Sequence, residues 1–255
     1  MDLALAWTEE EKQLLEGACR YTFDKAEDVY GMPLKDFTDE EKLAVFLEQA
    51  AERMCSPDGK VAASILMKRY AFLFVGALAS WSFFRKPLMI QEQDAMLIHS
   101  EQNGNWLPNF YLGKNPESAW QIEEVIRHIG KVVEAARKAS KLSNLIMWEN
   151  IAIYVFWLYE TVAEEERFAS VRDRARADFH WLLAPEQAKL FGNYHANPLA
   201  RYVNEKTAVE GRDALVRVRT TCCFNYRLDK EGAKKCGSCP KGCIPIKPRK
   251  QTSGA

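Results

Sequence analysis

The pattern of apolar and polar residues predicts a chain that is mostly helical. Apolar residues recur at helical spacing after two Thr-x-x-Glu sequences, which begin at Thr8 and Thr38 and are typical of capping boxes. Residues 60–84 and 142–162 are apolar on nearly all sides of a helix, so we predict two central helices there. These long apolar stretches form the predicted core of the protein.

Weaker patterns predict the remaining elements. Asn115-Pro116 resembles a cap followed by a first-turn proline and predicts a helix that continues to about residue 139. A charged amphipathic stretch over 165–183 and a short helix from Pro185 to the Gly192-Asn193 break follow. Short alternating runs between Pro87 and Tyr111 indicate one or two strands, and ALVRVR, residues 214–219, indicates another.

These elements together predict a mainly α fold with a small β element, either a hairpin or a short sheet. We divide the chain into a helical body, residues 1–210, with the short strands near 88–111, and a basic cysteine-rich segment, residues 211–250, followed by a tail, residues 251–255. A chain of 255 residues is long enough to bury a substantial core. The fold class is therefore a helical body that carries a C-terminal cysteine segment.

The sequence indicates a soluble cytoplasmic protein. Its first residues, MDLALAWTEEEK, lack the basic start of a secretory signal. The longest apolar run without charge, residues 70–84, has 15 residues, which is short of the ~20 that cross a bilayer. We therefore expect no integral membrane segment.

The net charge of zero hides an uneven distribution. Residues 211–250 contain 11 Lys and Arg against 3 Asp and Glu, so the rest of the chain is acidic by the same margin. A positive segment attracts anions such as a small ligand, an acidic protein or a nucleic acid.

Common catalytic motifs are missing from the sequence. There is no glycine-rich phosphate loop, no Gly-x-Ser-x-Gly and no His-Glu-x-x-His, and the four histidines are scattered. We interpret those histidines as structural or surface residues. Trp148 and Asn150 would pack in the core, and Cys19 and Cys55 would be small packing residues in helices.

The clustered cysteines are the strongest chemical signal. Residues 220–243 hold five of the seven cysteines, and four of them follow the pattern Cys-Cys-x12-Cys-x2-Cys. In a reducing cytoplasm such clusters indicate metal ligands or redox thiols. A structural zinc site is one interpretation. Adjacent cysteines in extended chain point in different directions, which suits a two-iron cluster at least as well as a single tetrahedral ion.

The cysteine segment resembles the C-terminal signature of the FhuF-type siderophore-iron reductases. The resemblance rests on the Cys222-Cys223 pair after RVRTT, the aromatic residues Phe224 and Tyr226, and the Cys-x-x-Cys-Pro that ends at Pro240. The sequences MWENIA and Asn-Pro-Leu at 197–199 are weaker landmarks of the same family. The family binds a [2Fe-2S] cluster through a Cys-Cys-x10-Cys-x2-Cys pattern, so the resemblance implies that cofactor here, with the ligands Cys222, Cys223, Cys236 and Cys239.

Two features depart from the family pattern. The spacer has 12 residues instead of 10, which costs well under ~1 kcal/mol of loop-closure entropy. Cys243 is an additional thiol that could replace a ligand, pair with another thiol or lie nearby, and we favour the last. A [4Fe-4S] centre remains an alternative, although the spacing of Cys236, Cys239 and Cys243 fits its usual motif poorly.

The resemblance implies a cytoplasmic ferric-siderophore reductase. Such an enzyme reduces the Fe(III) of an anionic citrate-based or hydroxamate siderophore by one electron, which it receives from a donor such as a ferredoxin or a reductase. Two alternatives stay open: an iron–sulfur electron carrier or redox sensor, and a zinc-stabilised module that binds nucleic acid, which we disfavour. The expected docking residues for the substrate are the basic residues around the cluster, Arg217, Arg219, Arg227, Lys234, Lys235 and Lys241.

Overall fold

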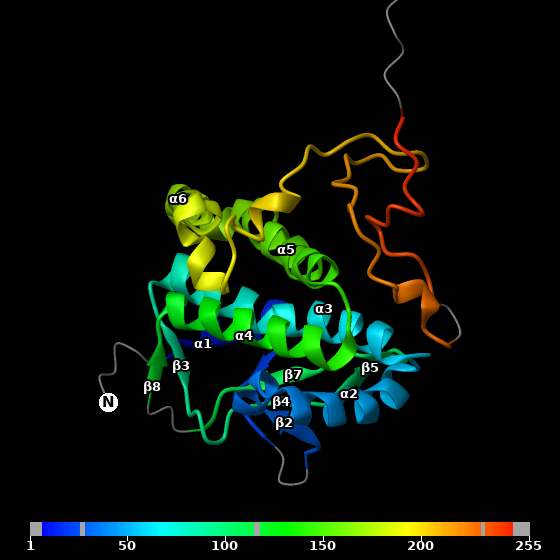
Figure 1. Cartoon of the computed structure of the whole chain (residues 1–255). Coiled ribbons are helices and arrows are strands. Elements are labelled where there is room, and N and C mark those ends of the chain that lie inside the picture. The colour runs from blue at the N-terminus through cyan, green and yellow to red at the C-terminus, as the bar shows by residue number, and fades with distance from the viewer. Residues whose placement is uncertain (1–6, 26–28, 115–117, 231–232, 247–255) are drawn as a thin grey trace, which may run out of the picture.

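The computed structural model describes residues 7–25, 29–114, 118–230 and 233–246. It confirms the predicted fold class, a mainly helical body with small sheets and a C-terminal cysteine segment (Figure 1). The helices of the body are α1 (Glu9–Cys19), α2 (Glu40–Met54), α3 (Gly59–Ala79), α4 (Ile122–Ser140), α5 (Asn144–Glu160) and α6 (Arg172–Leu183).

One of the two predicted capping boxes is confirmed and the other is corrected. At the start of α1, Thr8 Oγ1 accepts a hydrogen bond from the backbone N–H of Glu11, and the Glu11 carboxylate accepts one from the N–H of Thr8. At α2 the capping residue is Asp39, whose carboxylate accepts bonds from two backbone N–H groups, those of Glu41 and Lys42. Asp39 satisfies more orphan donors than the Thr38 hydroxyl could.

Helix α3 is the centre of the core. Its apolar side chains are buried on all sides, and its largest set of contacts is with α5. After Ala79 the chain continues as a single π-helical turn, η3 (Ser80–Phe84), which ends where Arg85 takes a left-handed conformation. In the described part of the chain, residues Gly59–Phe84 alone are long and apolar enough to cross a membrane, and 94% of their most apolar window is buried inside the fold, as expected for the core helix of a soluble protein.

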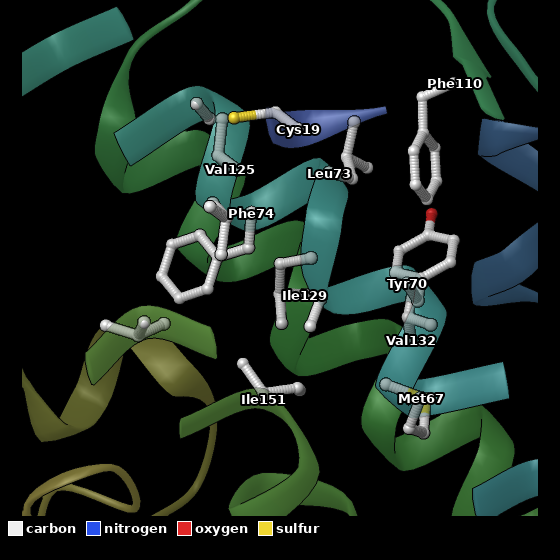
Figure 2. Close-up of a cluster of buried hydrophobic side chains, with 14 of the residues drawn as sticks. Cys19, Met67, Tyr70, Leu73, Phe74, Phe110, Val125, Ile129, Val132 and Ile151 are labelled. Carbon is white, nitrogen blue, oxygen red and sulfur yellow. The ribbon is translucent and has the colours of Figure 1, made fainter. Parts of the chain in front are cut away.

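The interior joins α3, α4 and α5. Figure 2 shows Tyr70 and Phe74 of α3 beside Ile129 of α4 and Ile151 of α5, all of which are almost fully buried. The Tyr70 hydroxyl lies 2.8 Å from Nε2 of His128, so this buried polar pair is satisfied. His128 therefore has the structural role that the sequence suggested.

The strands of the described residues form three small sheets. A four-stranded sheet has the order β1-β7-β4-β2, and β7 pairs parallel with β1 and antiparallel with β4. Two further antiparallel pairs are β3 with β8 and β5 with β6. The strands are β1 (Tyr21–Thr22), β2 (Gly31–Pro33), β3 (Leu88–Ile90), β4 (Met96–Ile98), β5 (Glu101–Gln102), β6 (Asn105–Trp106), β7 (Asn109–Tyr111) and β8 (Ser118–Trp120).

The strands predicted near 88–111 are present, but the boundary of the next helix differs from the prediction. The predicted cap at Asn115-Pro116 lies outside the described residues. Residues Ser118–Trp120 form β8, because they pair with β3 almost 30 residues earlier. Helix α4 therefore begins at Ile122 instead of 115.

The chain becomes irregular after α6. The short 3-10 helices η6 (Pro185–Phe191) and η7 (Ala200–Tyr202) lead into an extended segment whose described residues contain one further helical turn, η8 (Asn225–Arg227). The strand predicted over 214–219 is wrong, since only Val216 there makes a bridge, with Thr207. Figure 1 shows this segment in orange and red along one side of the helical body.

Candidate metal centre

The structure brings the four cysteines of the predicted motif into one region of the segment. The backbone N–H of Arg219 donates to the carbonyl of Ser238 at 2.9 Å, which places the chain before the first cysteine pair against the second. The thiols of Cys223 and Cys236 are in hydrogen-bond contact, and Cys222 interacts electrostatically with both Cys223 and Cys239. The segment therefore holds both parts of the cysteine motif beside each other.

Hydrogen bonds and nearby cations determine the protonation of these thiols. The Cys236 thiol donates to Cys223, which lowers the pKa of Cys223 against the opposing effect of burial, and Lys68 and Arg219 lower it further. The same hydrogen bond, together with burial, raises the pKa of Cys236. Burial also raises the pKa of Cys222. Cys223 is therefore the thiol that the surroundings most favour as a thiolate.

Backbone N–H groups point at the sulfur atoms of the first pair. The N–H of Phe224 donates to Cys222 Sγ at 3.4 Å, and the N–H of Asn225 donates to Cys223. Phe224 has a left-handed backbone conformation, with φ at 59°, which turns the chain around the pair. Such N–H···S bonds are typical of thiolate-ligated clusters, in which they tune the reduction potential.

Glu149 of α5 anchors the chain directly before the cysteines. Its carboxylate, which is 2% exposed, accepts hydrogen bonds from the backbone N–H of Thr220 at 2.6 Å and of Thr221 at 2.7 Å. Both threonine hydroxyls donate to the same carboxylate. A buried carboxylate with this many donors is well compensated for its loss of water. Glu149 therefore fixes the direction in which the first cysteine pair leaves the body.

A second set of hydrogen bonds links Arg219 of the segment, through two side chains of the body, to Cys223 of the segment. Arg219 Nη2 donates to Asn150 Oδ1 at 2.6 Å, and Asn150 Nδ2 donates to Ser64 Oγ at 3.0 Å. Ser64 Oγ then donates to the carbonyl of Cys223 at 2.8 Å. Since Ser64 and Asn150 belong to α3 and α5, the two core helices jointly position Cys223. The sequence MWENIA, residues 147–152, thus supplies two of the side chains that hold the cysteine segment, Glu149 and Asn150.

One predicted docking residue is corrected and one important residue was missed. Arg219 is 3% exposed, because its guanidinium lies against Glu149, with Nε 3.6 Å from Oε2, and against Asn150, so it does not offer an exposed docking group. Glu149 was not singled out in the sequence, although a lone carboxylate in the apolar run 144–158 was the available signal. Its partners lie about 70 residues away, where no local pattern reveals them.

The 12-residue spacer between the cysteine pairs is held to the body at several points. Arg227 forms an ion pair with Asp58 at 2.9 Å, and the N–H of Asp229 donates to the carbonyl of Cys55 at 2.7 Å. Lys230 Nζ donates to Asn105 Oδ1 at 2.6 Å, which connects the spacer to the β5–β6 hairpin. The longer spacer thus reaches the end of α2 and a small sheet of the body.

The remaining docking candidates lie on two sides of the cysteines. Arg217 forms an ion pair with Glu160 at 2.8 Å on the side of α5. Lys241 donates to the Tyr226 hydroxyl at 3.0 Å and acts electrostatically on Cys222 and Cys239, while Lys235 donates to the Lys241 carbonyl. Lys234 is exposed. We call the exposed group Lys234, Lys235 and Lys241 the lysine edge.

The other cysteines do not join the four. Cys243 is buried beside the Cys-x-x-Cys turn, where its Sγ donates to the Gly237 carbonyl at 3.3 Å and its N–H to the Cys239 carbonyl at 2.8 Å. Cys19 is buried at the end of α1, as expected. Cys55 is exposed and caps α2 in a left-handed conformation, which corrects its interpretation as a packing residue.

The remaining candidate residues are structural or exposed. Trp148 Nε1 donates to the Tyr194 hydroxyl at 2.8 Å, and Asn197 caps the local chain by accepting from the Leu199 N–H at 3.0 Å. His99 stacks on Tyr30 and accepts from the indole of Trp106. Burial lowers the pKa of both His99 and His128 to about 4. His180 and His195 lie on the surface.

The four-cysteine donor set fits a thiolate-bound iron–sulfur cluster. In the ranges that the structure describes, no three His, Cys, Asp or Glu side chains are arranged to hold a single metal ion. The fit therefore rests on the number and kind of the donors, four thiols of which Cys223 and Cys236 are hydrogen-bonded and Cys222 interacts with both Cys223 and Cys239. Each iron of a [2Fe-2S] cluster takes two thiolates, and the surrounding cations Lys68, Arg219 and Lys241 compensate thiolate charge.

Comparison with known proteins agrees with this description of the segment. A family model described as the FhuF 2Fe-2S C-terminal domain matches residues 219–241. The matched residues include both cysteine pairs and the spacer, so the chain carries a FhuF-type C-terminal cysteine motif, as the motif resemblance predicted. No curated protein and no solved structure matches the chain significantly.

Proposed function

We propose that the protein is a ferric-siderophore reductase whose [2Fe-2S] cluster is bound by Cys222, Cys223, Cys236 and Cys239. The observations that carry the proposal are the match of residues 219–241 to the FhuF 2Fe-2S domain and the mutual interaction of the four thiols within those residues. Bound there, the cluster would supply single electrons, at potentials that reach about −400 mV in plant-type thiolate examples.

The surrounding residues have definite tasks in this proposal. Glu149, Asn150 and Ser64 hold the first cysteine pair in place, so the ligands need little rearrangement when the cluster is loaded or changes its redox state. The buried cations Lys68 and Arg219 lie close enough to act on Cys223, and positive charge there favours the more negative, reduced state. The N–H groups of Phe224 and Asn225 act in the same direction.

The reaction needs only one electron per iron. The electron passes to the Fe(III) of the siderophore complex, which becomes Fe(II), while a one-electron donor such as a ferredoxin or a reductase restores the protein. Siderophores bind ferric iron through hard oxygen donors, and the lower charge of Fe(II) weakens that binding. No bond to carbon is made or broken, so a catalytic acid or base is not required, which agrees with the missing catalytic motifs. We expect this reaction in the cytoplasm, where donors of this kind operate.

An anaerobic single-turnover assay tests the proposal. Cluster-loaded protein is reduced with a stoichiometric chemical reductant and mixed with ferric citrate, a citrate-dihydroxamate complex or a trihydroxamate complex, in the presence of an Fe(II) chelator. We expect one Fe(II) captured for each cluster oxidised, with at least one of these complexes. If the cluster can be reduced and reoxidised but no ferric complex accepts its electron, the reductase assignment is wrong and an electron carrier or sensor replaces it.

A further inference from the structure

A cavity of about 810 Å³ lies between the cysteine segment and the helical body. One wall comes from α5 and α3, and the opposite wall comes from residues of the C-terminal segment that include Cys236, Gly237 and Ser238. Pockets that enclose compact organic ligands are commonly ~300–1,000 Å³, so this one has a suitable size. The cavity reaches a proposed cluster ligand, Cys236, so a molecule bound at that end of it would lie next to this residue.

Positive charge dominates the lining of the cavity. Among the described residues two carboxylates line it, Glu149 and Glu160, and both are already occupied by cations or hydrogen-bond donors. Glu160 pairs with Lys206 and Arg217, and Glu149 faces Arg219. The cationic side chains of the lining are Arg20, Lys68, Lys206, Arg212, Arg217 and Arg219.

Three of these cations have no ion pair with any described carboxylate. Arg20 donates to the Leu107 carbonyl and the Gln102 side chain, and Lys68, which is 7% exposed, donates to the Asn225 amide at 3.4 Å. The Arg212 guanidinium lies over Gly237, where Nη1 is 3.4 Å from the position that a Cβ would take. In addition, Nη1 of Arg219 is buried and donates no hydrogen bond to any described residue. These groups provide unused donors for an anion.

The remaining wall is apolar and aromatic. Phe72, Tyr154, Phe156 and Trp157 line it, together with Leu215 from the segment. A small inorganic anion would make no apolar contact with this wall. A ligand that combines negative charge with hydrocarbon or aromatic groups would use both halves of the lining.

We propose that this cavity is the substrate site, and that it binds an anionic ferric complex of a siderophore with apolar arms, such as a citrate-dihydroxamate, through Arg212 and its neighbouring cations. The identification of the ligand as an iron(III) complex rests on the proposed reductase function. The lysine edge lies outside the cavity, since none of its three lysines contributes to the lining. Of the docking residues expected from the sequence, only Arg217 and the buried Arg219 line the cavity.

Binding of a redox-inert analogue tests the site without electron transfer. The gallium(III) complex of a citrate-dihydroxamate is titrated into oxidised, cluster-loaded protein, and the affinity is measured by calorimetry. Arg212→Glu changes an exposed cavity cation, whereas Lys234→Glu changes an exposed cation of the lysine edge and alters the net charge equally. We expect Arg212→Glu to weaken binding by about tenfold or more and Lys234→Glu by about twofold at most.

Arg212→Gln removes the charge without reversing it and is a milder change that controls for a folding defect. Its loss of affinity for the gallium(III) complex should be intermediate between wild type and Arg212→Glu. The visible spectrum of each variant must match that of the wild type. Equal weakening in both charge reversals, a larger effect of Lys234→Glu, or no effect of Arg212→Glu would overturn the cavity assignment. Wild-type protein that does not bind the gallium complex would overturn it as well.

The same variants separate this inference from the proposed function. If the wild type reduces the ferric complex and Arg212→Glu reduces it with an unchanged KM, only the cavity assignment fails. If binding depends on Arg212 but no ferric complex is reduced, the anion site stands and the reductase assignment fails.

Discussion

The helical body and the cysteine segment are stabilised in different ways. The body buries a continuous apolar core between α3, α4 and α5, in which Leu66, Phe74 and Ile129 are fully enclosed. The segment has little regular structure and is fixed to the body by polar contacts, chiefly those of Glu149 and Asn150. Two of its few fully buried side chains are cysteines, Cys223 and Cys239.

The two modes of stabilisation predict that the folding of the helical body and the binding of the cluster depend on different residues. Apolar burial stabilises the body through many contacts, none of which is decisive alone. The segment depends on a few specific groups, because each unsatisfied buried donor or lost ligand removes a large part of what holds it. We therefore expect changes in the segment to affect the cluster strongly and leave the helices intact.

The largest effect is expected from replacing the ligands. Changing any one of Cys222, Cys223, Cys236 or Cys239 to Ser removes a thiolate, so the visible absorption and the iron content should fall to a small fraction of the wild-type values. Circular dichroism should show the helical body unchanged. Absorption spectra with iron and sulfide analysis of the purified variants provide the measurement.

The three other cysteines are matched controls. Cys19→Ser, Cys55→Ser and Cys243→Ser should keep the visible spectrum, because none of these thiols belongs to the Cys-Cys-x12-Cys-x2-Cys motif. Loss of the cluster in Cys243→Ser, with retention in one of the four ligand variants, would contradict the ligand assignment.

Removal of the cluster should loosen the segment alone. With a chelator and reductant, the amides of Arg219, Cys239 and Cys243, which are hydrogen-bonded within the segment, should exchange with deuterium at least about tenfold faster. Amides in the middle of α3 and α5 should keep their protection. Hydrogen exchange followed by mass spectrometry tests this, and equal loss of protection in both regions would mean that they unfold as one unit.

Glu149→Gln should weaken the attachment of the segment. The change removes the buried negative charge that faces Arg219 and accepts hydrogen bonds from Thr220 and Thr221. The lost interaction free energy is on the order of 3–5 kcal/mol. We expect several-fold faster loss of the cluster to a chelator. Glu160→Gln is the matched control on the same helix, since its half-exposed pairs with Lys206 and Arg217 do not touch the cysteines. Equal rates in the two variants would contradict the role of Glu149.

The sequence predicted the cysteine motif of the segment, but it did not predict the contacts that attach the segment to the helical body. The cysteine spacing and the apolar runs that became α3 and α5 are local signals, and they identified the motif and the core. The contacts of Glu149 with Thr220 and of Ser64 with Cys223 join residues 71 and 159 positions apart. Arg219 was expected on the surface for the same reason, because its buried partners belong to a distant helix. The parallel pairing of β1 with β7 was equally invisible from local pattern.

The smallest effect concerns the body and its response to acid. Burial, aided by Lys131, lowers the pKa of His128 from 6.5 to about 4. Between these two pH values the imidazole is protonated in the unfolded state and neutral in the folded state. Stability from this residue is complete above pH 6.5 and is lost as the pH falls toward 4, by about 2 kcal/mol at pH 5. His128→Gln should show a shallower decline between pH 7 and pH 5 in urea unfolding followed by circular dichroism. An unchanged slope would contradict the buried, neutral state of His128.

Chemical analysis of the purified wild-type protein tests the central claim most directly. The account predicts a coloured protein with two irons and two acid-labile sulfides per chain, whose spectrum bleaches on uptake of one electron. A colourless protein that contains zinc, and neither iron nor sulfide, would contradict it.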